Sequence, residues 1–188
     1  MNLFFFGGTF DPPHLGHYEI ASKCLTLADK VLVIPNNLSP EDKLQRTDAM
    51  HRFEMLKILF KNTEIEIDSY EISSNKINYT INTIKYLKNK YKDCKITMVV
   101  GLDQFQNLDN WYESKKIKEL VDVVCFNRNE IDLKENIYKN KMINENLNIN
   151  ISSTQLRQAF KKKNNQIIKK YLNIDVLNYI KENNLYVI

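Results

Sequence analysis

Short, continuously apolar runs alternate along the chain with longer segments in which apolar residues recur every three or four positions. The apolar runs have the length of β-strands and are bounded by glycine, proline or polar residues. They occupy residues 2–6, 30–35, 64–69, 95–101 and 121–127, with a weaker run at 147–151. Runs that are apolar at consecutive positions are typical of parallel strands whose two faces are both buried.

The segments between these runs carry the spacing of amphipathic helices. Helices are predicted at 14–28, 48–60 and 79–90, with short helices at 109–120 and a helical C-terminal third. Such alternation of strands and helices favours right-handed crossovers. The pattern therefore predicts an α/β fold: a Rossmann-like, doubly wound, mostly parallel sheet with helices on both faces and a helical C-terminal end. The polar segment 134–146 is expected to be a mobile excursion.

Composition is that of a globular protein, with 43% apolar residues and only four glycines and four prolines among 188 residues. At roughly 100 to 200 residues per domain, this length predicts one domain over residues 1–188. No apolar run approaches the roughly 20 residues that span a bilayer, so no membrane contact is expected. No secretion signal is visible, and the cysteines are odd in number. We therefore expect a cytoplasmic protein with Cys24 and Cys125 in its core.

The formal charge of +4 hints at an anionic partner, and a nucleic-acid-binding module is one interpretation of it. However, the lysines are scattered, and only 161–163 form a run, so we expect no nucleic-acid partner. Most of the charge is interpreted as solvated surface. The 27 basic residues include only four arginines, which makes each arginine more informative: Arg46, Arg52, Arg128 and Arg157.

The segment with the clearest chemistry is Gly-Gly-Thr-Phe-Asp-Pro-Pro-His-Leu-Gly-His at positions 7–17, between the first strand and the first helix. Gly7 and Gly8 allow a phosphate to approach the backbone closely, and Thr9 offers a hydroxyl. A helix that starts near His14 presents its N–H groups and the positive end of its dipole to an anion.

His14 and His17 are three positions apart, so they lie side by side on the first helical turn, with Gly16 leaving room for a ligand. Two imidazoles at a helix N-terminus can donate hydrogen bonds to a polyphosphate and offset charge that develops during its reaction. A zinc site is the alternative, but it usually needs a third ligand, and the remaining histidine is His51. We therefore predict no metal site made by the protein.

This segment resembles the signature of the HxGH nucleotidyltransferase superfamily, and the fuller pattern resembles the bacterial nicotinate-nucleotide adenylyltransferases. Further segments match that family in order along the chain. They are Asn78-Tyr79-Thr80 with Thr83, Gly101-Leu102-Asp103 with Trp111-Tyr112, and Ile151 to Arg157, which reads Ile-Ser-Ser-Thr-Gln-Leu-Arg. The Ile-Ser-Ser-Thr segment also reads as a helix start with hydroxyl caps, and hence as a second anion site.

The resemblance implies an ATP site and three catalytic residues: His14, His17 and Arg157. His17 would face the α phosphate, while His14, Ser153, Thr154 and Arg157 would hold the β and γ phosphates. Asp103 would bind the ribose of ATP. The ATP-binding set is therefore Gly7, Gly8, Thr9, Phe10, His14, His17, Gly101, Asp103, Ser153, Thr154 and Arg157.

The resemblance also implies a site for the acceptor, in which Trp111 stacks on a pyridine ring. Backbone N–H groups at Tyr79, Thr80 and Tyr112 would bind a carboxylate, which favours nicotinate over nicotinamide. The family's Pro-Asn-x-x-Pro-Pro-His loop departs here to Pro-Asn-Asn-Leu-Ser-Pro-Glu at positions 35–41. The residues carried over as contacts of the acceptor phosphate are Asn37 and Lys43. Arg128 follows the strand that ends at residue 127 and is expected to contact a phosphate in the substrate site, whereas Arg52 is as consistent with a structural role as with a catalytic one.

The implied activity is transfer of the adenylyl group of ATP to nicotinate mononucleotide, with Mg²⁺ bound to the ATP phosphates. The alternatives are an adenylyltransferase acting on nicotinamide mononucleotide or phosphopantetheine, and a nucleotide sensor without turnover. The sequence leaves open whether the chain forms a homo-oligomer.

Overall fold

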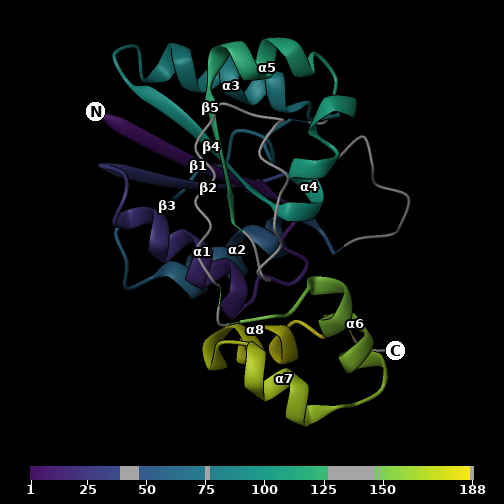
Figure 1. The fold of residues 1–188 in the computed structure, drawn as a ribbon. Coiled ribbons are helices and arrows are strands. Elements are labelled where there is room, and N and C mark those ends of the chain that lie inside the picture. The colour runs from purple at the N-terminus through teal and green to yellow at the C-terminus, as the bar shows by residue number, and fades with distance from the viewer. Residues whose placement is uncertain (39–46, 75–76, 127–146, 148, 187–188) are drawn as a thin grey trace.

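A computed structural model describes residues 1–188 except 39–46, 75–76, 127–146, 148 and 187–188. Its centre is a parallel sheet of five strands in the order β3-β2-β1-β4-β5 (Figure 1). The strands are β1 (Asn2–Gly8), β2 (Lys30–Pro35), β3 (Glu66–Ile67), β4 (Lys95–Gly101) and β5 (Asp122–Phe126). Beyond β1 the chain first builds β2 and β3 on one side and then crosses to β4, so the strand order reverses between β1 and β4.

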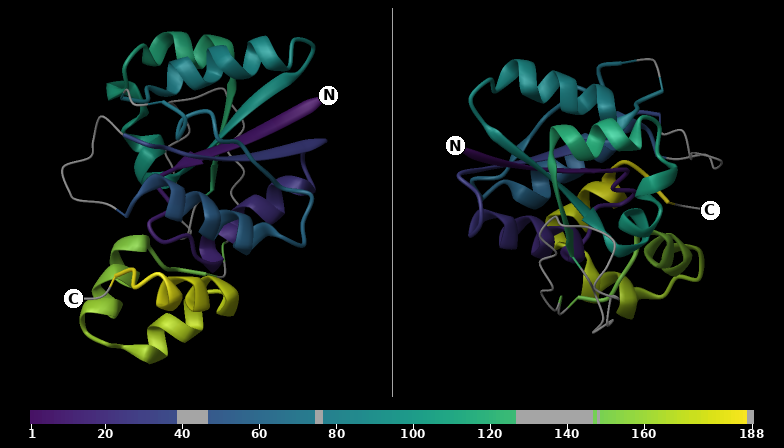
Figure 2. Two further views of the ribbon diagram at one scale, coloured as in Figure 1. Left: turned by 180° about the vertical axis from the view of Figure 1, so that it is seen from behind. Right: turned by 45° about the horizontal axis from the view of Figure 1, so that its top comes forward.

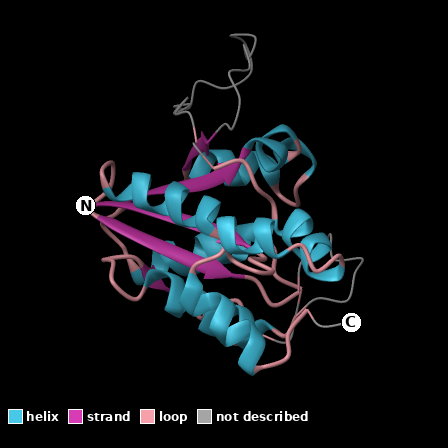
Figure 3. Cartoon of the chain, turned by 90° about the horizontal axis from the view of Figure 1, so that it is seen from below, coloured by secondary structure: helices cyan, strands magenta, loops and turns pink. Residues whose placement is uncertain are grey.

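Helices cover both faces of the sheet (Figures 1, 2 and 3). On one face lie α1 (Leu15–Leu25) and α2 (Ala49–Phe60), and on the other lie α3 (Thr80–Lys90), α4 (Leu102–Gln106), the 3-10 turn η1 (Leu108–Asn110) and α5 (Ser114–Leu120). The helices α6 (Ser153–Lys161), α7 (Asn165–Tyr171) and α8 (Ile174–Glu182) form a group beyond α1 and α2. The predicted Rossmann-like fold with a helical C-terminal end is confirmed.

Side chains along β1 point alternately to the two faces of the sheet, which explains why helices cover both faces. Phe4 and Phe6 pack with α1, α2 and the C-terminal helices, whereas Leu3 and Phe5 pack with α3, α4 and α5. All four side chains are buried. The cysteines expected in the core are there, since Cys24 and Cys125 have no exposed surface.

The weak strand predicted at 147–151 is wrong, because the described residues of this segment belong to no strand. Leu147 and Ile151 are nevertheless buried, and they pack against the α1 side of the sheet. The Ile149 N–H donates to Glu19 Oε2 on α1 at 3.1 Å rather than to a neighbouring strand. The apolar spacing thus reflects packing against a helix. The expected excursion at 134–146 lies outside the described residues.

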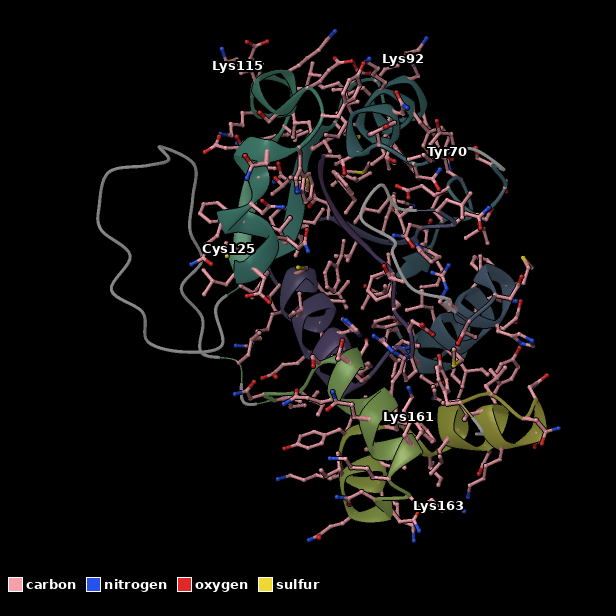
Figure 4. All side chains as sticks on the ribbon, turned by 90° about the vertical axis from the view of Figure 1, so that its right-hand side faces the viewer. Tyr70, Lys92, Lys115, Cys125, Lys161 and Lys163 are labelled. Carbon is pink, nitrogen blue, oxygen red and sulfur yellow. The ribbon has the colours of Figure 1, made fainter. Side chains whose placement is uncertain are left out.

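The structure bears on two further expectations, one about membrane-spanning helices and one about the lysine run 161–163. Within the described ranges, no helix is both long enough and apolar enough to cross a bilayer. The run 161–163 is exposed at the end of α6, and Figure 4 shows Lys161 and Lys163 there, away from the sheet.

We predict that Leu87→Ala lowers the free energy of unfolding by about 2–5 kcal/mol, because Leu87 is fully buried between α3 and the sheet. The matched control Leu27→Ala removes the same atoms from a side chain that is 38% exposed, and its effect should stay within about 1 kcal/mol. Urea denaturation measures both values. Equal losses would contradict the described packing.

Candidate active site

The turn that follows β1 is a tightly folded segment in which Gly8 and Phe10 face each other. Phe10 is buried and has φ 54°, a left-handed backbone conformation that turns its ring back over the end of β1. A Cβ atom on Gly8 would lie 3.0 Å from that ring, so any other residue at position 8 would require the Phe10 ring to shift. A Cβ on Gly7 would meet nothing within 4 Å, so this face of the backbone is open to a ligand.

His14 and His17 stack on each other at the start of α1, with 3.7 Å between ring centroids and 21° between planes. His14 is the N-cap residue, and its backbone N–H donates to His17 Nδ1 at 3.2 Å. Because Nδ1 accepts this hydrogen bond, the ring proton of a neutral His17 is placed on Nε2, where it can be donated to an anion. A Cβ on Gly16 would lie 3.1 Å from the His14 ring, which explains the glycine between the histidines.

Arg52 on α2 fixes the beginning of this turn from behind. Its side chain is 1% exposed, and Nη1 donates to the Thr9 carbonyl at 2.6 Å. The same guanidinium donates to the carbonyls of Thr47 and Asn37 and to the Asn36 side chain. The Asn36 amide in turn donates to Thr9 Oγ1 at 3.2 Å. Arg52 is therefore a structural residue that joins the ends of β1 and β2.

The start of α6 lies against the same turn. Ser152 caps the helix, accepting from the Gln155 N–H, as the hydroxyl-rich sequence predicts. Ser153 Oγ donates to the Pro12 carbonyl at 2.9 Å, and Arg157 Nη1 donates to the Asp11 carbonyl at 2.6 Å. The N-termini of α1 and α6 are thus brought to one turn, which concentrates two helix dipoles and an arginine there.

Arg157 also donates through Nη2 to Thr154 Oγ1 at 3.1 Å, and its side chain is 25% exposed. A guanidinium has five N–H donors, so these two bonds hold it in place and leave donors for a phosphate. Thr154 lies exposed in the first turn of α6. The structure therefore brings together the predicted residues Ser153, Thr154 and Arg157 beside the histidine pair.

Gly101 and Asp103 lie at the end of β4, next to β1 in the sheet. A Cβ on Gly101 would meet nothing within 4 Å, and Asp103 is exposed in the first turn of α4. Burial raises the pKa of the Cys125 thiol to about 11, and the negative charge of Asp103 adds to this shift. Cys125, labelled in Figure 4, is therefore a neutral core thiol.

The residues predicted to bind the acceptor gather at the start of α3. Tyr79 is its N-cap and Thr80 its first residue, and the Tyr79 ring lies 4.8 Å from the Tyr112 ring. Trp111 is partly buried against the same side of the sheet, whereas Tyr112 is 59% exposed. The two segments that the sequence matched separately thus meet in space.

Asn37 is joined to this region through Asn78, whose Oδ1 accepts from the Asn37 N–H and the Leu38 N–H, each at 3.2 Å. The Asn37 side chain donates to the Ser74 carbonyl at 2.7 Å. The predicted contacts Lys43 and Arg128 lie outside the described residues.

Several residues that shape the site were not assigned a role from the sequence. Asn36 directly follows β2 and Asn78 directly precedes the N-cap of α3, so polar side chains at a strand end and a helix start were a usable signal. Tyr186, which donates to Asp11, lies 175 positions away from it, and nothing in the local sequence marks it.

Glu71 and Thr83 form a buried hydrogen bond behind the first turn of α3, with Thr83 Oγ1 donating to Glu71 Oε1 at 2.5 Å. Burial raises the pKa of Glu71 above its ordinary value, and the charge of Asp68 adds to this, while the Thr83 hydrogen bond opposes it. This pair ties the loop after β3 to the helix that carries Thr80 at its start.

In the part of the chain that the structure describes, no group of three or more histidine, cysteine, aspartate or glutamate residues could hold a metal ion. His51 lies apart from the histidine pair, and its Nδ1 is 2.9 Å from Tyr179 Oη.

Comparison with known proteins defines the class. The Cytidylyltransferase-like family matches residues 5–159, which include the turn, both histidines and Arg157. Two curated relatives are named "Probable nicotinate-nucleotide adenylyltransferase". That from Aliarcobacter butzleri is 35% identical over 185 residues, covering 95% of this chain and 96% of its own. That from Borreliella afzelii is 36% identical over 192 residues, covering 100% and 97%.

Among solved structures, the nicotinic acid mononucleotide adenylyltransferase of Plasmodium falciparum in complex with NaAD has the same fold. Its TM-score is 0.85 at 23% identity, covering 98% of this chain and 97% of that one. The fold and site therefore define a nucleotidyltransferase. Within that class, this chain belongs to the nicotinate-nucleotide adenylyltransferase family.

We predict that Glu71→Gln gains stability relative to the unchanged protein as the pH rises. A raised pKa means that the folded state holds more protons than the unfolded state above the ordinary Glu value of 4.5, so unfolding becomes easier as the pH rises through this window. Gln keeps an acceptor for Thr83 and does not titrate. Urea denaturation at about pH 5 and about pH 8 measures the difference. The exposed Glu64→Gln is the matched control, and a difference that does not change with pH would contradict the prediction.

Proposed function

We propose that this chain transfers the adenylyl group of ATP to nicotinate mononucleotide and releases pyrophosphate, producing nicotinate adenine dinucleotide (deamido-NAD) for NAD biosynthesis. Family membership supports the reaction class. The observation that carries the proposal is the histidine pair stacked at the N-terminus of α1, beside Arg157 and the start of α6. All three cysteines are free thiols, which suits the cytoplasm as its location.

The reaction is an in-line displacement at phosphorus. An oxygen of the 5′-phosphate of nicotinate mononucleotide attacks the α phosphorus of ATP, a new P–O bond forms, and the bond from the α phosphorus to the bridging oxygen breaks. A phosphate monoester is already anionic at neutral pH, so no general base is needed. The catalytic contribution is positioning of the reactants and neutralisation of charge.

Each catalytic residue has a task that its geometry supports. His17 donates from Nε2 to the α phosphate, because its Nδ1 is occupied by the His14 N–H. His14 and Arg157, with the first turn of α6, hold the β and γ phosphates and stabilise the leaving pyrophosphate. Gly7, Gly8, Thr9 and Phe10 line the base of this site, and Gly101 and Asp103 hold the ribose.

Nucleotidyltransferases generally use a divalent metal ion. We propose Mg²⁺ bound to the phosphates of ATP, so that it enters as part of the substrate and neutralises phosphate charge. A hard cation brought in this way needs no carboxylate cluster from the protein.

The contact between the Tyr79 and Tyr112 rings supports the proposed acceptor site. N–H groups at Tyr79, Thr80 and Tyr112 bind the nicotinate carboxylate, and Trp111 stacks on the pyridine ring. An amide carries no negative charge for these donors, so nicotinamide mononucleotide is the poorer acceptor. Asn37, Lys43 and Arg128 are proposed to contact the acceptor phosphate.

We predict pyrophosphate release from Mg-ATP with nicotinate mononucleotide, and much slower release with nicotinamide mononucleotide or phosphopantetheine, because only the first combines a pyridine ring with a carboxylate. A coupled pyrophosphate assay compares the three acceptors under one set of conditions. Faster release with either of the other two acceptors would overturn the assignment. No release with any acceptor would favour the nucleotide sensor instead.

We predict that His17→Ala lowers kcat by about 10²–10³-fold, the usual cost of removing one donor to a charged transition state. Because α1 stays buried through Ile20, Ala21 and Cys24, the unfolding free energy should change little by comparison. His51→Ala is the matched control, since its ring contacts Tyr179 rather than the turn. Near-normal kcat in the His17 variant would remove it from the mechanism.

We predict that EDTA abolishes turnover and that added Mg²⁺ restores it, while the thermal unfolding midpoint of the ligand-free protein is the same with and without EDTA. The reason is that the ion arrives with ATP. Thermal unfolding followed by circular dichroism checks this, and a lowered midpoint in EDTA would instead indicate an ion held by the protein.

A further inference from the structure

Tyr186, which follows α8, reaches the turn that carries the catalytic histidines. Its hydroxyl donates to Asp11 Oδ1 at 2.5 Å, and its ring stacks on Phe160 of α6, with centroids 5.3 Å apart. The chain turns back after α8 through left-handed residues at Asn184 and Tyr186, with φ 50° and 58°. Figure 1 shows this end of the chain beside α6.

Asp11 is 2% exposed, so its carboxylate depends on partners within the protein. Oδ1 accepts from Tyr186, Oδ2 lies 3.5 Å from the Thr47 N–H, and Oδ2 is 4.0 Å from Arg157 Nη1. Among these described contacts, the hydrogen bond from Tyr186 is the shortest. Burial and then the charge of Asp11 raise the pKa of Tyr186, so its hydroxyl remains a proton donor at neutral pH.

The position of Asp11 links this contact to catalysis. Its neighbour Phe10 packs edge-on against His17 at 4.9 Å, and its own carbonyl accepts from Arg157. Loss of the Tyr186 donor to Oδ1 would remove a hydrogen bond from a buried carboxylate, and Arg157, whose Nη1 lies 4.0 Å from Oδ2, is a cation within reach among the described residues. The guanidinium would then turn toward the carboxylate and away from a phosphate.

We propose that Tyr186 is a positioning residue: by donating its hydroxyl to Asp11, it holds the turn after β1 and keeps the guanidinium of Arg157 directed to the phosphates of ATP. The effect on turnover rests on the proposed function, whereas the effect on the turn itself does not. Tyr186 acts through Asp11 and does not touch the reactants.

The experiment is Tyr186→Phe, which removes only the hydroxyl and keeps the ring stacked on Phe160. The matched control is Tyr179→Phe. It deletes a hydroxyl on α8 that contacts His51 of α2 rather than the turn after β1. We expect Tyr186→Phe to lower kcat about tenfold and to raise the KM for ATP, within the roughly 10²-fold that small misplacements cost. In Tyr186→Phe, the KM for nicotinate mononucleotide should stay within about twofold of the unchanged protein. In the control variant, kcat and both KM values should stay within the same limit, which corresponds to about 0.4 kcal/mol.

A second measurement is independent of turnover: amide hydrogen exchange of Phe10, Asp11 and His14 by NMR, since residues 12 and 13 are prolines without an amide hydrogen. Exchange there should become faster in Tyr186→Phe and stay unchanged in Tyr179→Phe, while exchange in β4 stays the same in both. If the protein shows no adenylyltransferase activity, this result still decides the proposal. Unchanged exchange in the turn, or equal losses of kcat in both variants, would overturn it.

Discussion

The turn between β1 and α1 depends on hydrogen bonds from outside itself. Its carbonyl groups belong to neither a strand nor a helix, and buried backbone groups need partners. Arg52 donates to Thr9, Arg157 to Asp11 and Ser153 to Pro12. These donors come from α2 and α6, so helices distant in sequence hold the turn in place. The histidine pair begins where this turn ends, so the placement of its two rings depends on the same hydrogen bonds.

This arrangement suits a reaction in which the protein supplies position and charge. The N-termini of α1 and α6 and the Arg157 guanidinium point to one region, and the open backbone faces at Gly7 and Gly101 lie at the adjacent ends of β1 and β4. Donors held rigidly before a ligand arrives need not reorganise when charge develops on phosphorus. Arg157 satisfies the Asp11 carbonyl, and other N–H groups of its guanidinium remain for the phosphate that we propose it binds.

Much of the fold could be predicted from local pattern. Apolar runs marked β1, β2, β4 and β5, since each is buried on both faces, and the glycine-rich segment after β1 located the site at the point of strand reversal. The weak strand at 147–151 was wrong, because apolar spacing alone does not distinguish packing on a helix from pairing with a strand. The short α4 was not predicted because five residues carry too little periodicity.

Contacts between residues far apart in the sequence could not be predicted from local pattern. The roles of Arg52 and Tyr186 depend on which carbonyl or carboxylate lies opposite them after folding, and neither has a neighbouring motif that specifies this. By contrast, the meeting of Tyr79 with Tyr112 followed from two motif matches assigned to one ligand. Family pattern thus selected the candidate residues, and the tertiary structure shows which contacts hold them.

The central claim is that the turn at residues 9–14 has its active form before ATP binds. Crystal structures of the protein alone and with a non-hydrolysable ATP analogue test it directly. We expect the same backbone in both, with Arg157 still donating to the Asp11 carbonyl while its remaining N–H groups contact the phosphates. A turn that refolds around the analogue, with Arg157 detached from Asp11, would contradict the account.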